Sequence, residues 1–222
     1  MTPLILAVDT THAHGSLALA RAGDLAEEVA LESPSGFAHV IYSHLEALLG
    51  RHRVSVDDVD CFAAASGPGA FTGVRVCLAC VKGLAEAAGK PAVAVSNLAA
   101  IASFGTSPLR AALLDARRGE IYAAVYDDAG RLVRPETVAP PARWLEALPE
   151  EVELVSPDFS AFADALAASR FHHARRTIAP HALAAAIARI AWRRSKAGEA
   201  ADPAALDANY VRRSDAELLW KG

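Results

Sequence analysis

The fold is decided by residues 4–20, which read Leu-Ile-Leu-Ala-Val-Asp-Thr-Thr-His-Ala-His-Gly-Ser-Leu-Ala-Leu-Ala. The first five residues form a continuous apolar run, which predicts a buried strand that ends at Asp9. Residues 10–14 are a polar connection, and Gly15 to Ala20 alternate small or polar residues with apolar ones, as a returning strand does. A third strand is expected from Asp24 to Leu31. The stretch therefore predicts three consecutive strands, of which the first ends in a carboxylate.

The same pattern occurs again about 106 residues later. A run at residues 110–114, apolar after Arg110, ends at Asp115, a connection at 116–119 contains Gly119, and alternating residues follow at 120–126. A third strand is expected at 131–138. Two β-hairpins can look alike by chance, but here the order and the spacing repeat together. The sequence therefore predicts an internal duplication.

Helical patterns alternate with strands between and after the two copies. Helices are expected at 34–49, 71–88, 96–103, 142–148, 158–168 and 180–196, and strands at 60–66, 91–95 and 151–155. Helices between strands favour parallel pairing and an α/β class. We expect an N-terminal lobe over residues 1–105 and a C-terminal lobe over residues 106–222, with an irregular tail from Asp202.

Composition excludes several classes of protein. Hydrophobic residues make up 53% of the 222 residues, which rules out global disorder, and the net charge of −4 argues against a chain that binds nucleic acid over its whole surface. Three cysteines do not make a disulfide framework. We find no leader pattern and no apolar run long enough for a membrane span, so a cytoplasmic protein without membrane contact is expected.

The motif that says most about function is a glycine-rich loop at residues 67–75, Gly-Pro-Gly-Ala-Phe-Thr-Gly-Val-Arg. It lies between an expected strand and a long expected helix, where helix amides can bind an anion. No Gly-Lys-Ser/Thr follows, so the loop is not a P-loop. The alternative is a tight turn that lets the helix pack closely on the sheet.

Three segments together resemble the TsaB family, also called YeaZ. They are residues 6–11 (Leu-Ala-Val-Asp-Thr-Thr), the glycine-rich loop, and residues 115–122 (Asp-Ala-Arg-Arg-Gly-Glu-Ile-Tyr). The tail at 209–213, Asn-Tyr-Val-Arg-Arg, is also similar. The resemblance implies a duplicated actin-like (ASKHA, ribonuclease H-like) fold of two lobes, with mixed sheets flanked by helices.

The resemblance also implies a function and partners. The chain would be a noncatalytic scaffold in the synthesis of threonylcarbamoyladenosine at position 37 of tRNAs that read ANN codons. It would dimerise with the catalytic subunit TsaD (YgjD), and the ATPase TsaE (YjeE) would join them. The chain would contact tRNA only as part of this complex, and it is expected to form a homodimer in isolation. Older descriptions label such chains as M22 glycoprotease-like.

Features of an active site that the resemblance leads us to expect are missing from this sequence. Catalytic relatives hold a metal through a His-x-x-x-His pair, whereas residues 92–98 here contain no histidine, cysteine or carboxylate. The candidate adenosine turn at 156–159 contains Pro157 and Phe159 where bare backbone is needed. We therefore expect no catalytic residue, no metal, no cofactor, and weak or no ATP binding. An autonomous actin-fold ATPase or kinase, and a metallopeptidase, remain the alternatives.

Three sets of residues follow as candidates. The first is a vestigial phosphate loop and hairpin: Asp9, Thr10, Thr11, Gly67, Pro68, Gly69, Thr72, Gly73 and Asp115. The second is a partner interface on the helices at 34–49 and 71–88: Phe37, Ile41, Leu45, Leu48, Phe71, Val74, Arg75, Leu78, Val81 and Lys82. The third is a basic pair for tRNA or ATPase docking, Arg212 and Arg213. Cys77 and Cys80 are expected to be buried core residues rather than a redox pair.

Overall fold

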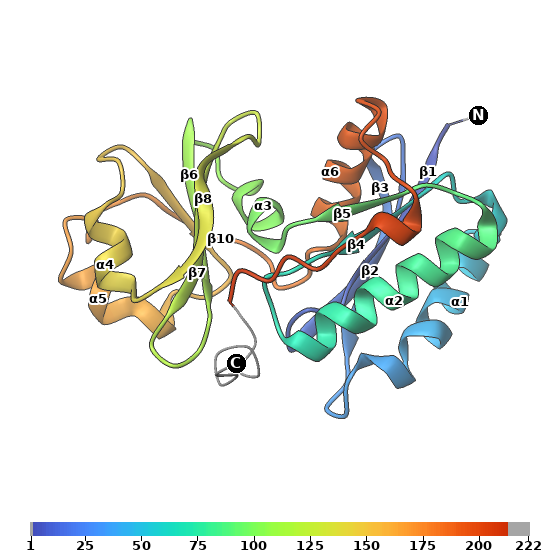
Figure 1. The fold of residues 1–222 in the computed structure, drawn as a ribbon, viewed down its shortest axis with the longest axis horizontal. Helices are drawn as coiled ribbons and strands as arrows, with labels where there is room; N and C mark the ends of the chain where they lie inside the picture. Colours follow the sequence, from blue (N-terminus) through green and yellow to red (C-terminus); the bar gives the residue numbers. More distant parts are fainter. Residues whose placement is uncertain (1, 213–222) are drawn as a thin grey trace, which may run out of the picture. The chain divides into compact units, whose positions relative to one another are not determined.

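A computed structural model describes residues 2–212, which divide into two compact units. Of these residues, the first unit comprises 2–97 and 181–209, and the second comprises 98–180 and 210–212. Each unit is built on one five-stranded sheet. Figure 1 shows the two sheets with their covering helices.

The sheet of the first unit has the order β3-β2-β1-β4-β5. The strand β1 pairs antiparallel with β2 and parallel with β4, so the sheet is mixed. Burial of every residue of β1 explains why its sequence is apolar up to Asp9. The bounds are β1 Leu4–Asp9, β2 His14–Arg21, β3 Asp24–Glu32, β4 Cys61–Ala65 and β5 Ala92–Val95.

Helices cover both faces of this sheet. The helices α1 and α2 lie on one face, and α6 lies on the other face (Figure 1). Helix α2 ends where Gly89 adopts a left-handed φ of 61°, a conformation that glycine takes without strain. The bounds are η1 Phe37–His39, α1 Ile41–Arg51, η2 Val56–Asp58, α2 Phe71–Ala88, α6 Ala184–Lys196 and η4 Pro203–Ala205.

The sheet of the second unit has the order β10-β9-β6-β7-β8. Its core contains Trp144, Leu145, Phe162, Leu166 and Phe171, packed on the inward residues of β6 and β7. The bounds are α3 Asn97–Ala102, β6 Leu109–Asp115, β7 Ile121–Asp127, β8 Leu132–Ala139, α4 Pro141–Glu146, β9 Glu153–Ser156, η3 Ser160–Phe162, α5 Ala163–Ala167 and β10 Arg176–Ile178.

The two sheets have the same topology, which confirms the duplication in the fold. Strands β1 to β5 correspond in order and pairing to β6 to β10. The expected helix at 71–88 is confirmed with the same bounds. The expected helix at 34–49 begins later, at Ile41, after a short 3-10 turn, and the helix expected at 158–168 reduces to η3 and α5.

The boundaries of the units differ from the expected lobes, because residues 181–209 return to the first unit. Helix α6 packs on β1, β2, β4 and β5. The backbone N–H groups of Leu183 and Ala184 donate to the buried Ser16 Oγ at 3.1 and 2.9 Å. Since a helix N-terminus leaves its first amides unpaired, this hydroxyl attaches α6 to β2.

Candidate functional site

A buried polar network occupies the end of β1 in the first unit. Asp9 Oδ1 accepts hydrogen bonds from the backbone N–H of Thr11 at 2.8 Å and from its hydroxyl at 2.6 Å. Asp9, Thr10 and Thr11 are all 1% exposed or less. Buried polar groups are stable only when they are hydrogen-bonded, so these contacts fix the connection between β1 and β2.

Asn97, the first residue of α3, completes the network and was not predicted from the sequence. Its Nδ2 donates to Thr11 Oγ1 at 2.7 Å and lies 3.4 Å from Asp9 Oδ2. Its Oδ1 accepts from the backbone N–H of Gly67 at 3.0 Å. Asn97 is fully buried. One side-chain amide therefore joins the β1–β2 connection to the glycine-rich loop.

The glycine-rich loop packs directly on the β1–β2 connection. Thr10 Oγ1 donates to Gly73 O at 2.8 Å, and the backbone N–H of Ala70 donates to Thr11 O at 2.7 Å. A Cβ atom added to Gly73 would lie 2.1 Å from Thr10 O, and one added to Gly69 would lie 2.5 Å from Thr11 O. Glycine is therefore required at both positions for this close approach of backbones.

These contacts occupy three backbone donors of the loop and the hairpin that an anion could otherwise use. The N–H of Thr11 is bonded to Asp9, that of Ala70 to Thr11 O, and that of Gly67 to Asn97. Six predicted vestigial residues thus come together: Asp9, Thr10, Thr11, Gly67, Gly69 and Gly73. Pro68 is buried in the same loop, whereas Thr72 is exposed at the start of α2. Asp115 lies in the second unit.

The corresponding connection in the second unit has a different character. Asp115 Oδ1 accepts from the backbone N–H of Arg117 at 2.7 Å, in the same way as Asp9 does from Thr11. However, Arg117 and Arg118 are exposed, and both adopt left-handed backbone angles, with φ of 63° and 57°. Such conformations are strained for residues other than glycine, asparagine and aspartate.

Arg212 is held on this second hairpin. Its Nη1 donates to Ala116 O at 2.8 Å, its Nη2 forms an ion pair with Glu120, and its guanidinium lies 5.6 Å from the centre of the Tyr122 ring. The side chain is 20% exposed. The structure therefore places Arg212 in a contact within the chain, rather than on the open surface where docking was expected. Arg213 lies outside the described residues.

The structure corrects most of the predicted partner interface. Seven of the ten residues are 7% exposed or less and contribute to the core of the first unit: Phe37, Ile41, Leu45, Leu48, Val74, Leu78 and Val81. The physical reason is that the apolar faces of α1 and α2 are used on the chain's own sheet. Phe71 and Arg75 remain exposed, and Lys82 is half-buried with its Nζ donating to Ala204 O.

A different face of α2 is available at the surface. Phe71, Arg75, Ala79 and Gly83 recur every four residues and are all exposed. The Arg75 guanidinium lies 3.8 Å from the centre of the Phe71 ring, which is 44% exposed. Tyr42 of α1 is 59% exposed and hydrogen-bonded to Cys80 of α2. We call Tyr42, Phe71, Arg75, Ala79 and Gly83 the outer helix face.

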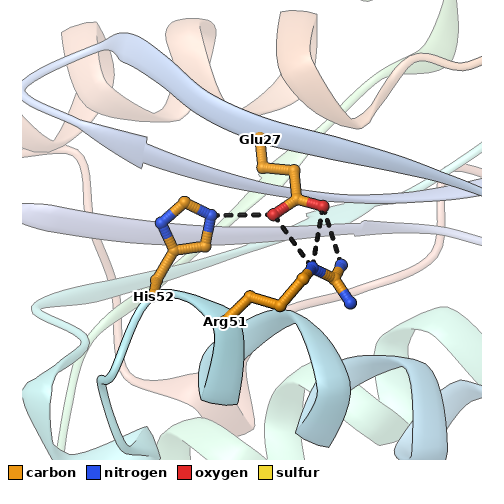
Figure 2. Close-up of polar contacts among 3 residues, drawn as sticks. All are labelled: Glu27, Arg51 and His52. Carbon is orange, nitrogen blue, oxygen red and sulfur yellow. Dashed lines mark hydrogen bonds and ion pairs between the residues drawn. The ribbon is translucent and has the colours of Figure 1, made fainter.

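The end of α1 is attached to β3 by a cluster around Glu27 (Figure 2). Arg51 Nη2 and His52 Nε2 lie 2.7 and 2.8 Å from the two oxygens of Glu27. Hydrogen bonds from Arg51, and next from His52, hold the pKa of Glu27 below its usual value. The cluster positions α1, and with it Tyr42.

The three cysteines are buried and free of disulfide bonds, which confirms the expectation of core cysteines. Burial raises the pKa values of the Cys61 and Cys80 thiols to about 11. Cys77 Sγ donates to Val8 O at 3.0 Å. A thiol with a raised pKa is a poor nucleophile, so Cys77 and Cys80 do not form a reactive pair.

Residues 2–212 contain neither a metal-binding cluster nor a helix suited to a membrane. No group of three or more histidine, cysteine, aspartate or glutamate side chains there could hold a metal ion. Within the same residues, no helix has the length and apolar character that crossing a membrane requires.

Comparison with known proteins shows to which family the chain is similar. Residues 35–206 match the model of TsaD, tRNA N6-adenosine threonylcarbamoyltransferase. The chain is 29% identical to the tRNA threonylcarbamoyladenosine biosynthesis protein TsaB of Bacillus subtilis, over 97% of both chains. It is similar to the structure of YeaZ from Pseudomonas aeruginosa, with a TM-score of 0.77 and 28% identity over 94% of this chain and 99% of that one. A ROK hexokinase from Thermus thermophilus, at 13% identity and a TM-score of 0.52 over 88% of this chain and 100% of that one, shares the fold alone.

Proposed function

The chain belongs to the TsaD family and within it to TsaB/YeaZ, and we propose that it is a noncatalytic scaffold for the TsaD subunit. The fold is the duplicated actin-like fold that the family resemblance implied. A role in the synthesis of threonylcarbamoyladenosine in tRNA follows from the family. The scaffold role, the partners and the missing catalysis are the proposal.

The observation that carries the proposal is the outer helix face. Its residues on α2 are small or flat where a second helix would approach, since Ala79 and Gly83 follow Phe71 and Arg75 along one line. Exposed aromatic and arginine side chains are typical centres of protein interfaces. We infer that this face binds TsaD, with TsaE joining the pair, and that it pairs two copies of the chain when TsaD is absent.

The absence of catalysis rests on the buried network at Asp9. A nucleotide phosphate that bound at the end of β1 would compete with the hydrogen bonds among Asp9, Thr11, Asn97 and Gly67, each of which is buried. We therefore expect no heat of binding when Mg-ATP is titrated into the isolated chain. Micromolar affinity would contradict this part of the proposal and favour an ATPase.

Reconstitution tests the scaffold role. We expect tRNA modification by TsaD, TsaE and a supply of threonylcarbamoyl-adenylate to depend on this chain. Ala79→Arg should prevent co-elution with TsaD, because it places a long charged side chain at the centre of the outer helix face. Ala167→Arg, which makes the same change at an exposed position of α5, is the matched control. Equal modification without the chain, or intact co-elution of Ala79→Arg, would refute the proposal.

Light scattering tests the homodimer. The isolated chain should have the mass of two copies at high concentration, and Ala79→Arg should reduce it to one copy. A mass of one copy for the unsubstituted chain at all concentrations would contradict pairing through this face.

A further inference from the structure

A basic strip lies on the second unit, where the chain passes from α5 into β10. It consists of residues 170–176, which read Arg-Phe-His-His-Ala-Arg-Arg. The three arginines and two histidines are exposed, while Phe171 is buried in the core of the unit. The segment contains no acidic residue, although the chain as a whole has a net charge of −4. Positive charge is therefore concentrated locally.

Two of the guanidinium groups are oriented by neutral partners. Arg170 donates to Leu148 O and lies 5.1 Å from the centre of the Phe171 ring. Arg176 donates to His172 O at 3.1 Å and lies 5.9 Å from the centre of the Phe159 ring. Carbonyls and ring faces satisfy some donors of a guanidinium but do not neutralise its charge. Both groups thus keep positive charge in a fixed position.

The third guanidinium is attached to a buried carboxylate. Arg175 Nε lies 3.4 Å from Glu153 Oε1, and the Arg175 side chain is 64% exposed while that of Glu153 is fully buried. This ion pair attaches the strip to the start of β9. It uses one side of Arg175 and leaves most of the side chain at the surface.

Aromatic rings accompany these charges. The rings of His172 and His173 have centres 4.1 Å apart, tilted by 47°, and both residues are exposed. Nucleic-acid bases stack on such rings, and guanidinium groups bind phosphate with two donors. An acidic peptide would use the guanidinium groups but would have no use for the exposed rings.

We propose that the basic strip binds the sugar-phosphate backbone of an RNA, with the rings of His172 and His173 in contact with its bases. The proposal rests on the proposed function, since that function brings a tRNA to the complex. A second explanation is protection of an edge strand, because β10 is the last strand of its sheet and charges at an edge prevent aggregation. The experiment must separate the two.

Replacement of arginine by glutamate separates them, because glutamate also protects an edge but repels phosphate. The probe is a fluorescently labelled, unmodified tRNA transcript, and the anisotropy of the probe is measured with the full-length chain at 50–200 mM salt. In Arg170→Glu/Arg176→Glu we expect affinity at 50 mM salt to fall about tenfold, and the slope of log K against log salt to fall by about 2. His172→Ala/His173→Ala should weaken binding severalfold without changing the slope.

The matched control is Arg189→Glu/Arg193→Glu, which makes the same charge change at exposed positions of α6 in the first unit. It should keep the slope and lose less than threefold in affinity. Equal loss in both double variants would overturn the proposal, as would no measurable RNA binding by the unsubstituted chain at 50 mM salt. Competition by polyglutamate as strong as that by polyuridine would overturn it too, in favour of an acidic protein partner. Thermal unfolding checks that each variant is folded.

Co-elution with TsaD separates a failure of the RNA-binding strip from a failure of the scaffold role. Arg170→Glu/Arg176→Glu should still co-elute with TsaD, because the strip and the outer helix face belong to different units. RNA affinity unchanged in a variant that co-elutes would refute the strip alone. Strip-dependent RNA binding by a chain that never co-elutes with TsaD would refute the scaffold role alone.

Discussion

The hairpins that follow β1 and β6 occupy the same position in the two sheets, but they are stabilised in different ways. After β1, the carboxylate of Asp9 is buried among Thr11, Asn97 and the glycine-rich loop. After β6, Asp115 bonds its own turn, Arg117 and Arg118 are exposed, and Arg212 supplies the closing ion pair.

The difference shows that the two copies of a duplicated element can share a topology while different residues surround them. Both hairpins retain the Asp turn, because a carboxylate that accepts a backbone N–H two residues later stabilises it in either place. In the part of the chain that the structure describes, only the first hairpin has a glycine-rich loop packed on it. We therefore expect substitutions around Asp9 to cost far more stability than those around Asp115.

The largest loss of stability is expected for Gly73→Ala. The added Cβ would lie 2.1 Å from Thr10 O, which is a backbone atom, so the loop or the hairpin must shift. We expect a loss of about 3 kcal/mol in the free energy of unfolding, measured by chemical denaturation. Gly83→Ala in the same helix is the control, because nothing lies within 4 Å of its added Cβ. It should gain about 0.5–1 kcal/mol. Equal behaviour of the two variants would show that the loop does not pack closely on the hairpin.

Asn97→Ala should have the next largest effect. It removes the amide that bonds Thr11 Oγ1 and Gly67 N, and it leaves those buried groups without this partner. The expected loss is about 2–3 kcal/mol in the free energy of unfolding. Thr72→Ala, at an exposed position of the same loop region, should change it by less than about 0.5 kcal/mol. If Asn97→Ala lowers the free energy of unfolding no more than Thr72→Ala does, the buried amide does not stabilise the hairpin more than an exposed residue.

A pH measurement extends the contrast to a buried carboxylate of the second unit. Burial raises the pKa of Glu153, but hydrogen bonds from Thr177 and from the backbone of Ser107 and Thr106 outweigh burial and hold the pKa below its ordinary value. Because the folded pKa is depressed, its stabilising contribution is present above about pH 4.5 and is lost as pH falls through the folded value.

Glu153→Gln should therefore be less stable than the unsubstituted chain by about 1–2 kcal/mol at pH 7, because it weakens hydrogen bonds to a charged group. The difference should shrink at acid pH. Chemical denaturation at pH 7 and pH 3 measures it. A difference that is constant across this range would show that the charge of Glu153 does not contribute.

Some of the fold could be predicted from sequence because its signals are local. Helix α2 was predicted with its observed bounds, since a helical apolar pattern is followed by Gly89. The helix expected at 158–168 was wrong at its start, because Asp158 Oδ1 accepts from the N–H of Ser160 and favours a turn. The three-residue strand β10 is too short to give a pattern.

The candidate site was predictable only in part, for a physical reason. The glycines and Asp9 carry their own turn signals, but the role of Asn97 depends on partners 30 and 86 residues away. Periodicity identified Ile41 and Leu45 as one face of a helix, and it could not say whether a partner or the chain's own sheet would cover that face. Burial in the first unit settles it.

The smallest effect is expected for Arg212→Ala, on the hairpin of the second unit. The variant loses the ion pair with Glu120 and the hydrogen bond to Ala116 O, both partly exposed to solvent. Solvent weakens such pairs, so the expected loss is about 1 kcal/mol or less in the free energy of unfolding. Arg212→Lys should recover little, because one ammonium group does not reproduce two guanidinium contacts. A cost as large as that of Asn97→Ala would mean that the tail stabilises the second hairpin as strongly as the glycine-rich loop stabilises the first.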